Sequence, residues 1–201
     1  SHRARPAKVT PLVLVHGFMG GGEQWETLYP DLSGTFDLIA LDLPGFGRNN
    51  HLDVINTIGG FADWVIAELT VRKITRYHLL RHSMGGMIAQ EIALRDADRV
   101  QHLVLYATGA TGVLPGRFET IEESKERALA DGASATARRI AATWFLEKEH
   151  ANGYVDCAAI AEQSTIQSIT AGLDAMQSWS GVGNLPFVKA RTLVIWGDND
   201  R

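Results

Sequence analysis

One short segment constrains the fold of this chain more than any other. Residues 77–80 (Tyr-His-Leu-Leu) form a short apolar run, Arg81 and His82 follow, and Ser83-Met84-Gly85-Gly86 then opens a stretch with helical character. A chain that passes from a strand through one serine into a helix must turn sharply, and small residues let the two elements approach each other. Such a turn exposes the serine hydroxyl and directs the first helix amides toward developing negative charge. Ser83 is therefore a candidate nucleophile.

Apolar strands and helical stretches alternate on both sides of this turn. Strands are predicted at 9–15, 36–41, 77–80, 100–107 and 192–196, and helices at 23–32, 57–70 and 84–94. Continuous apolar runs suit strands that are buried on both faces of a parallel sheet, joined by right-handed crossovers. The sequence therefore predicts the α/β class, with a mostly parallel central sheet flanked by helices.

Strand signals stop between residues 113 and 185, where the sequence is rich in alanine, glutamate, arginine and glutamine. This composition predicts a helical insertion that interrupts the sheet. We therefore expect three parts: the first part of the core at 1–112, a helical cap at 113–185, and a final core strand at 186–201. The charges from Glu119 to Arg127 are of mixed sign, which predicts a solvated helix face without a binding role.

Composition excludes several classes of function. The 201 residues carry a formal net charge of −4 and scattered basic residues, which does not fit a nucleic-acid partner. Cys157 is the only cysteine, so neither an intramolecular disulfide nor a thiolate metal cluster can form. No apolar run approaches the roughly 20 residues that span a bilayer, and the basic first eight residues lack the apolar run of a signal peptide. We expect a protein of the reducing cytoplasm without a membrane partner; a homodimer stays open.

Four motifs in order resemble the α/β-hydrolase superfamily, in particular its esterase, enol-lactonase and carbon–carbon hydrolase branches. The serine turn resembles the nucleophile elbow of that family. His16-Gly17-Phe18-Met19-Gly20-Gly21 is similar to its oxyanion loop, and Leu41-Asp42-Leu43-Pro44-Gly45-Phe46-Gly47 to the turn after its next strand. Residues 193–200 (Leu-Val-Ile-Trp-Gly-Asp-Asn-Asp) resemble the strand that presents the acid of the catalytic triad.

The resemblance implies a role for each matching residue. Ser83 would be the nucleophile, the backbone amides of Phe18 and Met84 would bind the oxyanion, and Asp200 would be the triad acid that orients a histidine. Asp198 is expected to cap local amides in the turn. We expect His16 to hold the oxyanion loop by hydrogen bonding rather than to act as the base.

The cap of such a protein would cover the active site. Its aromatic residues Trp144, Phe145 and Trp179 are candidates for substrate contact, as are Phe118 and Met176. Apolar residues at helical spacing also attach a cap to its domain, and the sequence leaves both roles open for each of them. A segment at 153–160 is similar to a cap segment of enol-lactonase-like members, which favours small carboxylated or lactone substrates.

Two positions depart from the family pattern. Arg81 stands two residues before the serine, where the elbow normally has glycine, so we expect a strained elbow or displaced neighbours. The sequence ends at Arg201, one residue after the expected acid, whereas the family places its catalytic histidine after a further strand. The other histidines (His2, His51, His78, His102 and His150) lie at positions the family does not use. We therefore expect a fragment whose triad histidine lies outside this sequence.

The residues and the resemblance together predict a serine hydrolase that acts on a small carboxylic ester or lactone through an acyl-enzyme, without a cofactor or metal. Two alternatives stay open. One is a non-catalytic ligand-binding member of the fold, which Arg81 and the missing histidine favour. The other is a carbon–carbon bond hydrolase or lyase of the same superfamily. Dehalogenase chemistry has the least support, because Ser83 stands where that branch needs an aspartate.

Overall fold

A five-stranded, all-parallel sheet forms the centre of the molecule in the computed structural model, which describes residues 9–200. The basic start at 1–8 and residue 201 lie outside the described residues. The strand order is β2-β1-β3-β4-β5. The strands are β1 (Leu12–Val15), β2 (Leu38–Leu41), β3 (Tyr77–His82), β4 (Val100–Tyr106) and β5 (Arg191–Ile195). The predicted α/β class and parallel sheet are confirmed.

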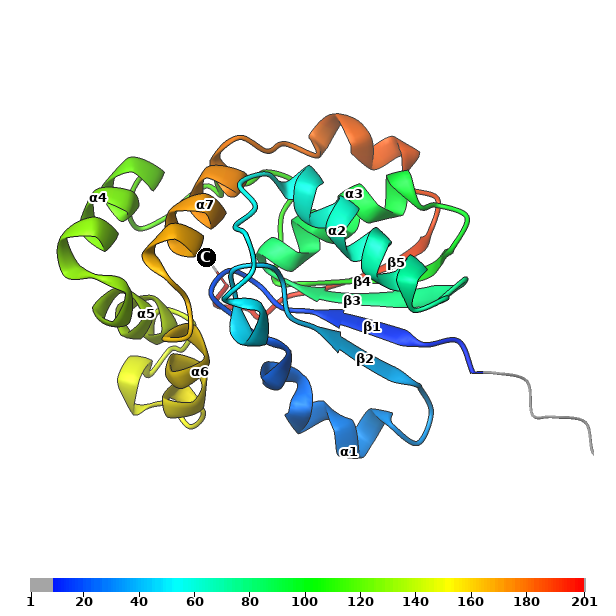
Figure 1. Cartoon of the computed structure of the whole chain (residues 1–201), viewed down its shortest axis with the longest axis horizontal. Helices are drawn as coiled ribbons and strands as arrows, with labels where there is room; N and C mark the ends of the chain where they lie inside the picture. The colour runs from blue at the N-terminus through cyan, green and yellow to red at the C-terminus, as the bar shows by residue number, and fades with distance from the viewer. Residues whose placement is uncertain (1–8, 201) are drawn as a thin grey trace, which may run out of the picture.

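The two faces of the sheet bury different clusters. Val13 and Val15 point into the main core with Leu79, against α2 (Ile58–Val71) and α3 (Met84–Arg95). Leu12 and Leu14 point to the opposite face and pack with Trp25. Figure 1 shows α2 and α3 on one side of the sheet and α1 (Tyr29–Leu32) on the other. Because successive residues of β1 are buried on opposite faces of the sheet, all four residues of the strand are apolar.

The structure corrects one predicted helix. The segment expected to form a helix at 23–32 is mostly a 3-10 helix, η1 (Gly22–Leu28), followed by the single turn α1. Pro30 lies within the first residues of α1, where its missing amide hydrogen costs no helix bond. The helix expected at 57–70 is confirmed as α2, and the side chain of Thr57 caps its start by accepting from the Gly60 amide at 3.0 Å.

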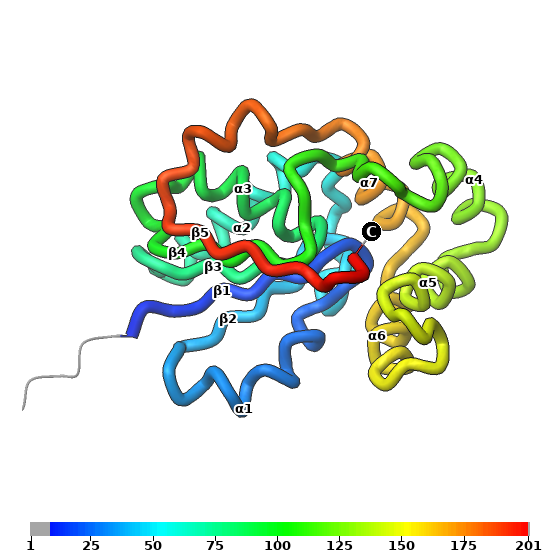
Figure 2. The backbone as a smooth tube through the Cα atoms, turned by 180° about the vertical axis from the view of Figure 1, so that it is seen from behind, coloured from blue at the N-terminus to red at the C-terminus, as the bar shows by residue number. Residues whose placement is uncertain are grey.

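Four helices lie between β4 and β5 in the sequence, as the composition predicted. They are α4 (Ile121–Asp131), α5 (Ala133–Ala142), α6 (Tyr154–Ala161) and α7 (Ile166–Gln177), and short 3-10 turns occur at η3 (Lys148–His150) and η4 (Val182–Phe187). We call residues 113–185 the helical insertion. Figures 1 and 2 show α4 to α7 beside the carboxyl ends of the strands rather than on a sheet face.

The strand β5 forms one edge of the sheet and pairs only with β4 among the described residues. All five of its residues are exposed, and Trp196 directly after it is also exposed. The prediction of a strand that is buried on both faces is therefore wrong for β5 in residues 9–200. None of the helices in this range is long and apolar enough to cross a membrane.

Candidate active site

Ser83 occupies the turn between β3 and α3 in a backbone conformation that side chains rarely adopt. Its φ is 52° and its ψ is −123°. A non-glycine residue in such a conformation costs on the order of 1–3 kcal/mol and persists where its surroundings hold it. Three hydrogen bonds do so here: the Ser83 amide donates to the Tyr106 carbonyl at 3.0 Å, while the Ser83 carbonyl accepts from the Gly86 amide and the Thr108 hydroxyl, both at 2.8 Å.

Glycines allow the close approach of backbones around this turn. A Cβ atom on Gly85 would lie 2.5 Å from the carbonyl oxygen of His16 and 2.8 Å from that of Val15. A Cβ atom on Gly17 would lie 2.9 Å from the Ser83 Cβ. The loop after β1 therefore passes directly against the serine, as the sequence indicated.

This approach leaves two backbone amides beside Ser83. Met84 begins α3, so its amide has no acceptor one turn earlier in the helix. The amide of Phe18 follows Gly17 and makes no hydrogen bond within residues 9–200. Two free donors beside a partly buried serine are an arrangement that could bind an oxyanion.

His16 holds this loop in place. The backbone amide of Leu43 donates to its Nε2 at 2.9 Å, so the proton is on Nδ1, which donates to the Gly17 carbonyl at 2.7 Å. Burial lowers the pKa of His16 to about 4, and the ring is therefore neutral at pH 7. These contacts agree with the predicted structural role of His16. Asp42 supports the same loop by accepting from the Gly22 amide at 2.8 Å.

The side chain of Arg81 is fully buried. The backbone at this position is ordinary strand, because the left-handed conformation occurs at Ser83 instead. The expected backbone strain at residue 81 is therefore absent. Its Nε, Nη1 and Nη2 atoms have no hydrogen-bond partner in the described part of the chain. Burial lowers the pKa of Arg81 to about 9, which leaves it charged at neutral pH.

The predicted acid lies at the same end of the sheet. Asp200 follows β5, and its carboxylate accepts from the Gly197 amide at 2.8 Å. The turn is therefore capped by Asp200, whereas the sequence had assigned this role to Asp198. The ring of His82 lies 5.2 Å from that of Tyr106. Burial lowers the pKa of His82, and the charge of Asp200 partly opposes this effect.

The hydroxyl of Ser83 forms no hydrogen bond with a histidine anywhere in residues 9–200. His78 and His102 lie against each other farther along the sheet, with their Nδ1 atoms 3.1 Å apart. The structure thus brings the serine turn and the two amides together, and it places no base in contact with the nucleophile among these residues.

The helical insertion contacts the loops of the site directly. A Cβ atom on Gly172 of α7 would lie 2.8 Å from the Phe18 ring, and one on Gly45 would lie 2.8 Å from Ser168. Trp144 and Phe145 pack against the main core. Trp179 donates from Nε1 to Glu91 of α3 at 2.8 Å, so this side chain attaches the insertion to the core. The substrate role of these three aromatic residues stays a prediction.

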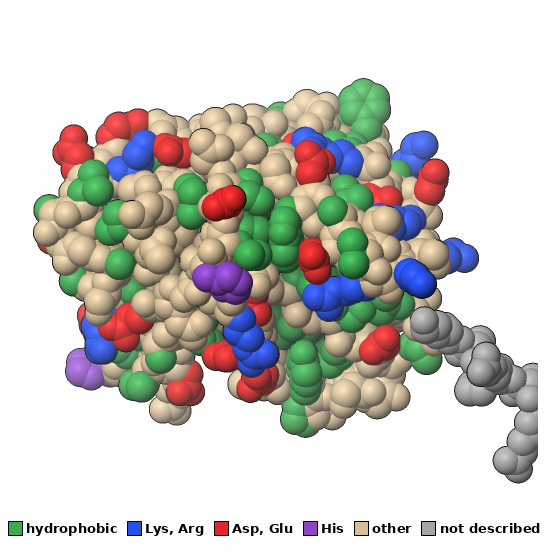
Figure 3. Space-filling model, in the orientation of Figure 1, with side chains coloured by type: hydrophobic (Ala, Val, Ile, Leu, Met, Phe, Trp, Pro, Cys, Tyr) green, Lys and Arg blue, Asp and Glu red, His purple; other side chains and the backbone are tan. Residues whose placement is uncertain are grey.

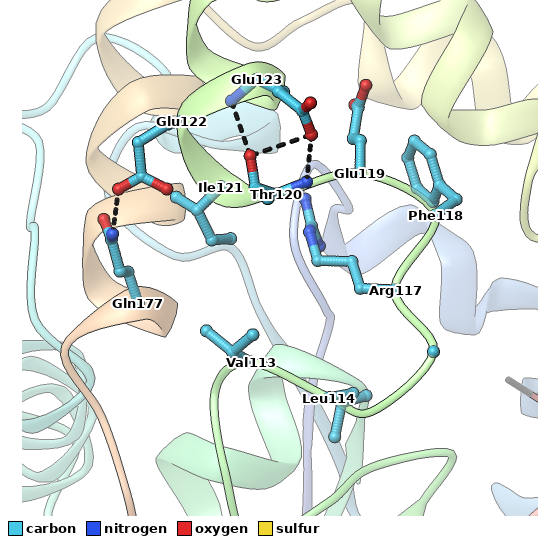
Figure 4. A pocket seen from close by; sticks show the side chains of 11 residues that line it. Val113, Leu114, Arg117, Phe118, Glu119, Thr120, Ile121, Glu122, Glu123 and Gln177 are labelled. Carbon is cyan, nitrogen blue, oxygen red and sulfur yellow. Dashed lines mark hydrogen bonds between the residues drawn. The ribbon is translucent and has the colours of Figure 1, made fainter.

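A cavity of about 560 Å³ opens between the segment at 113–118, the start of α4 and the end of α7. Figure 4 shows Val113 and Leu114 at one end of it and the α4 residues Ile121 and Glu122 at the other. Trp144, Phe145 and Trp179 do not line it, whereas Phe118 does.

The sequence missed an ion-pair network in the insertion. Glu119 accepts from Arg139 at 3.1 Å and from the Ser124 hydroxyl at 2.8 Å, and it lies 3.7 Å from Arg127. Its side chain is only 11% exposed, so this part of the charged run is not a solvated face. Figure 3 shows acidic and basic side chains interspersed on the face seen there, rather than separated by sign.

Comparison with known proteins identifies the family. The model of the alpha/beta hydrolase fold family matches residues 10–201, which is nearly the whole chain. The chain belongs to this family, and the predicted resemblance is confirmed.

Curated relatives cover different parts of the chain. A pimeloyl-[acyl-carrier protein] methyl ester esterase from Proteus mirabilis is 31% identical over 146 residues, 71% of this chain and 54% of that protein. A dihydrolipoyllysine-residue acetyltransferase component of the acetoin cleaving system from Pseudomonas putida is 38% identical over 103 residues, 51% of this chain and 28% of that protein. The chain thus spans about half the length of the first relative and less of the second.

Solved structures share the fold. The enol-lactonase from Burkholderia xenovorans LB400 superposes with a TM-score of 0.86 at 21% identity, covering 97% of this chain and 75% of that one. A thermophilic esterase from Thermogutta terrifontis gives a TM-score of 0.79 at 24% identity, covering 94% and 71%. At these identities the likeness establishes the fold alone.

Proposed function

We propose that this chain carries the nucleophile and the oxyanion site of a serine hydrolase that cleaves a small carboxylic ester or lactone. The observation that carries the proposal is the strained Ser83 at the β3–α3 turn, with the free amides of Phe18 and Met84 beside it. Proteins retain backbone strain where function needs it, and here the strain lifts a hydroxyl toward two hydrogen-bond donors. The methyl ester esterase among the similar proteins supports the same class of reaction.

The chemistry follows from these groups. The Ser83 hydroxyl attacks the acyl carbon while its proton passes to a base, and the carbonyl oxygen becomes an oxyanion held by the two amides. The carbon–oxygen bond to the leaving alcohol then breaks, the alcohol takes the proton, and an acyl-serine ester remains. Water attacks this ester, and a carboxylic acid is released together with the free serine.

Asp200 is proposed as the acid that orients the histidine base. It follows the edge strand β5, and its charge already acts on the histidine next to the nucleophile, His82. The strand ends of a parallel sheet meet at one edge, so Asp200 and Ser83 belong to the same end of the molecule.

The proposal is tested with the whole protein on a panel of p-nitrophenyl esters and five- and six-membered lactones. We expect hydrolysis of at least one of these substrates and a loss of at least about a thousandfold in kcat for Ser83→Ala. Ser178→Ala is the matched control, because Ser178 lies at the exposed end of α7 and bonds only local backbone carbonyls. Equal rates for Ser83→Ala and the unchanged protein would contradict the proposal.

A ligand-binding protein without catalysis is the second candidate, and the lack of a histidine bonded to Ser83 among residues 9–200 favours it. Calorimetry with the panel substrates separates the two. Tight binding by a folded protein that turns over none of the substrates, together with failure of Ser83 to react, would support the second candidate.

A further inference from the structure

Arg81 is a charged side chain within an apolar core. It points to the same face of β3 as Tyr77 and Leu79, the face that packs against α2 and α3. In the register of the sheet it lies between Val15 of β1 and Leu105 of β4. Its exposed fraction is 0%.

None of the three guanidinium nitrogens has a hydrogen-bond partner in residues 9–200, and no carboxylate in this range lies within ion-pair distance. Burying a charge without a partner costs several kcal/mol, and proteins otherwise pair such groups. Arg99 on the neighbouring strand connection shows the usual solution, because it pairs with Asp96 at 2.8 Å. The positive charge of Arg81 therefore has no acidic partner among the described residues.

The place of Arg81 in the chain and in the sheet connects it with the proposed reaction. Arg81 precedes Ser83 by two residues, and its partner in the sheet, Val15, directly precedes the loop that contains His16 and Phe18. The charge of Arg81 acts on His16 and helps to keep that ring neutral. Both segments that supply the amides beside Ser83 thus begin next to Arg81.

We propose that Arg81 stabilises the oxyanion formed at Ser83 through its buried, unpaired charge, without contact with the reacting atoms. This inference rests on the proposed function. The carbonyl oxygen of the substrate becomes negatively charged only after attack by Ser83, so its attraction to Arg81 strengthens as the reaction proceeds and lowers the barrier rather than the affinity for a neutral ester. In the resting protein the same charge is a cost to stability.

The test removes the charge of Arg81 and keeps an unbranched side chain at this position. In the whole protein, Arg81→Met should lower kcat for p-nitrophenyl acetate about tenfold, which corresponds to about 1.4 kcal/mol, with an unchanged KM. Phenylboronic acid forms an anionic tetrahedral adduct with a reactive serine, so its inhibition constant should rise by the same factor. The variant should also melt at a higher temperature, because an uncompensated charge leaves the core.

Leu79→Met is the matched control, because Leu79 is buried on the same face of β3 and its replacement changes packing without changing charge. Arg81→Gln is a second neutral variant for the case that the methionine variant does not fold. A purely structural role for Arg81 would move KM or the melting temperature and leave the boronate constant unchanged.

The outcomes separate the two proposals. If the unchanged protein hydrolyses the ester and both neutral variants keep its kcat and boronate constant, the inference about Arg81 is wrong and the proposed function stands. If Ser83 of the folded, unchanged protein reacts with neither ester nor boronate, the proposed function is wrong and the inference about Arg81 falls with it.

Discussion

The β3–α3 turn and the helical insertion differ in whether a buried arginine has an acidic partner. In the insertion, Arg139 is largely buried, but it contacts Glu119 at 3.1 Å and lies 4.0 Å from Asp131. In the core, Arg81 is fully buried and contacts no acid among the described residues. The insertion pairs Arg139 with an acid of its own segment, although its Nε and Nη2 atoms have no hydrogen-bond partner among the described residues. The core leaves Arg81 without any acidic partner in this range, two residues before the residue that we propose as the nucleophile.

The same contrast holds for the backbone. At the serine turn, glycines lie so close to other backbone atoms that no side chain fits, and Ser83 itself is strained. In the insertion, a Cβ atom on Gly132 would meet nothing within 4 Å. The backbone is therefore tightly packed at the turn, whereas the insertion combines open positions such as Gly132 with close ones such as Gly172.

The largest effect should come from Gly85→Ala, which breaks the packing of the turn. The new Cβ atom would lie 2.5 Å from the His16 carbonyl oxygen, and a rigid backbone cannot yield to it. We expect a loss of at least about 3 kcal/mol in the free energy of unfolding, measured by urea denaturation. Gly183→Ala in the insertion is the control: its Cβ atom would also meet nothing within 4 Å and its φ is not positive, so it should lose less than about 1 kcal/mol. Equal losses would contradict the contrast between the two regions.

Glu119→Ala should have the next largest effect, because it removes the partner of the largely buried Arg139. We expect a loss of about 3 kcal/mol in the free energy of unfolding, the lower end for a broken buried pair. Glu126→Ala, which removes an exposed acid of the following helix α4, should change the melting temperature little. If the two variants have the same melting temperature, the ion-pair network does not stabilise the insertion.

The pH dependence of stability tests whether His16 is neutral in the folded protein. The pKa of His16 is about 4 in the folded protein, below its usual value of about 6.5. Between these values the unfolded chain binds a proton that the folded protein does not, so the free energy of unfolding decreases as the pH falls from about 6.5 to about 4. This slope is about 1.4 kcal/mol per pH unit, up to about 3 kcal/mol in all.

The slope is measured by urea denaturation at pH 4.5, 5.5 and 6.5, with His16→Gln as the comparison. The glutamine variant should be less stable at pH 6.5, because it loses the bonds to Gly17 and Leu43, and its pH slope should be flatter. An identical slope in both proteins would mean that His16 is not the neutral, buried group described above.

The smallest effect should come from Thr120→Ala at the start of α4. The Thr120 hydroxyl accepts from the Glu123 amide at 3.1 Å, which forms one half of a capping box. Its loss should cost about 1 kcal/mol, seen as a lower melting temperature. Thr143→Ala serves as a control, since that hydroxyl bonds only to the Ile140 carbonyl one turn earlier. A Thr120 variant as stable as this control would show that α4 does not depend on its cap.

Much of the core could be predicted because its signals are local. Apolar runs predict buried strands, and they do so for β1 to β4 without reference to distant residues. Glycines likewise predict close packing at the turn. The parallel sheet and the position of Ser83 could therefore be predicted from the sequence. The 3-10 geometry of η1 could not be predicted, because its residues suit either kind of helix.

The remaining differences depend on contacts between distant residues. Glu119 and Arg139 are 20 positions apart, and a charged run contains no signal for which acid will be buried. Trp179 bonds to Glu91 across 88 positions, so its aromatic character alone indicated substrate contact as well as packing. Asp198 and Asp200 lie in the same short turn, and only the backbone conformation decides which carboxylate accepts from Gly197.

The central claim is that Ser83 is an activated nucleophile, and covalent labelling tests it most directly. The whole protein and its Ser83→Ala variant are treated with a fluorophosphonate and compared by intact mass, followed by mapping of the modified peptide. We expect one added phosphonyl group, located at Ser83, and no addition to the variant. A folded protein that gains no mass, or the same gain in both proteins, would contradict it.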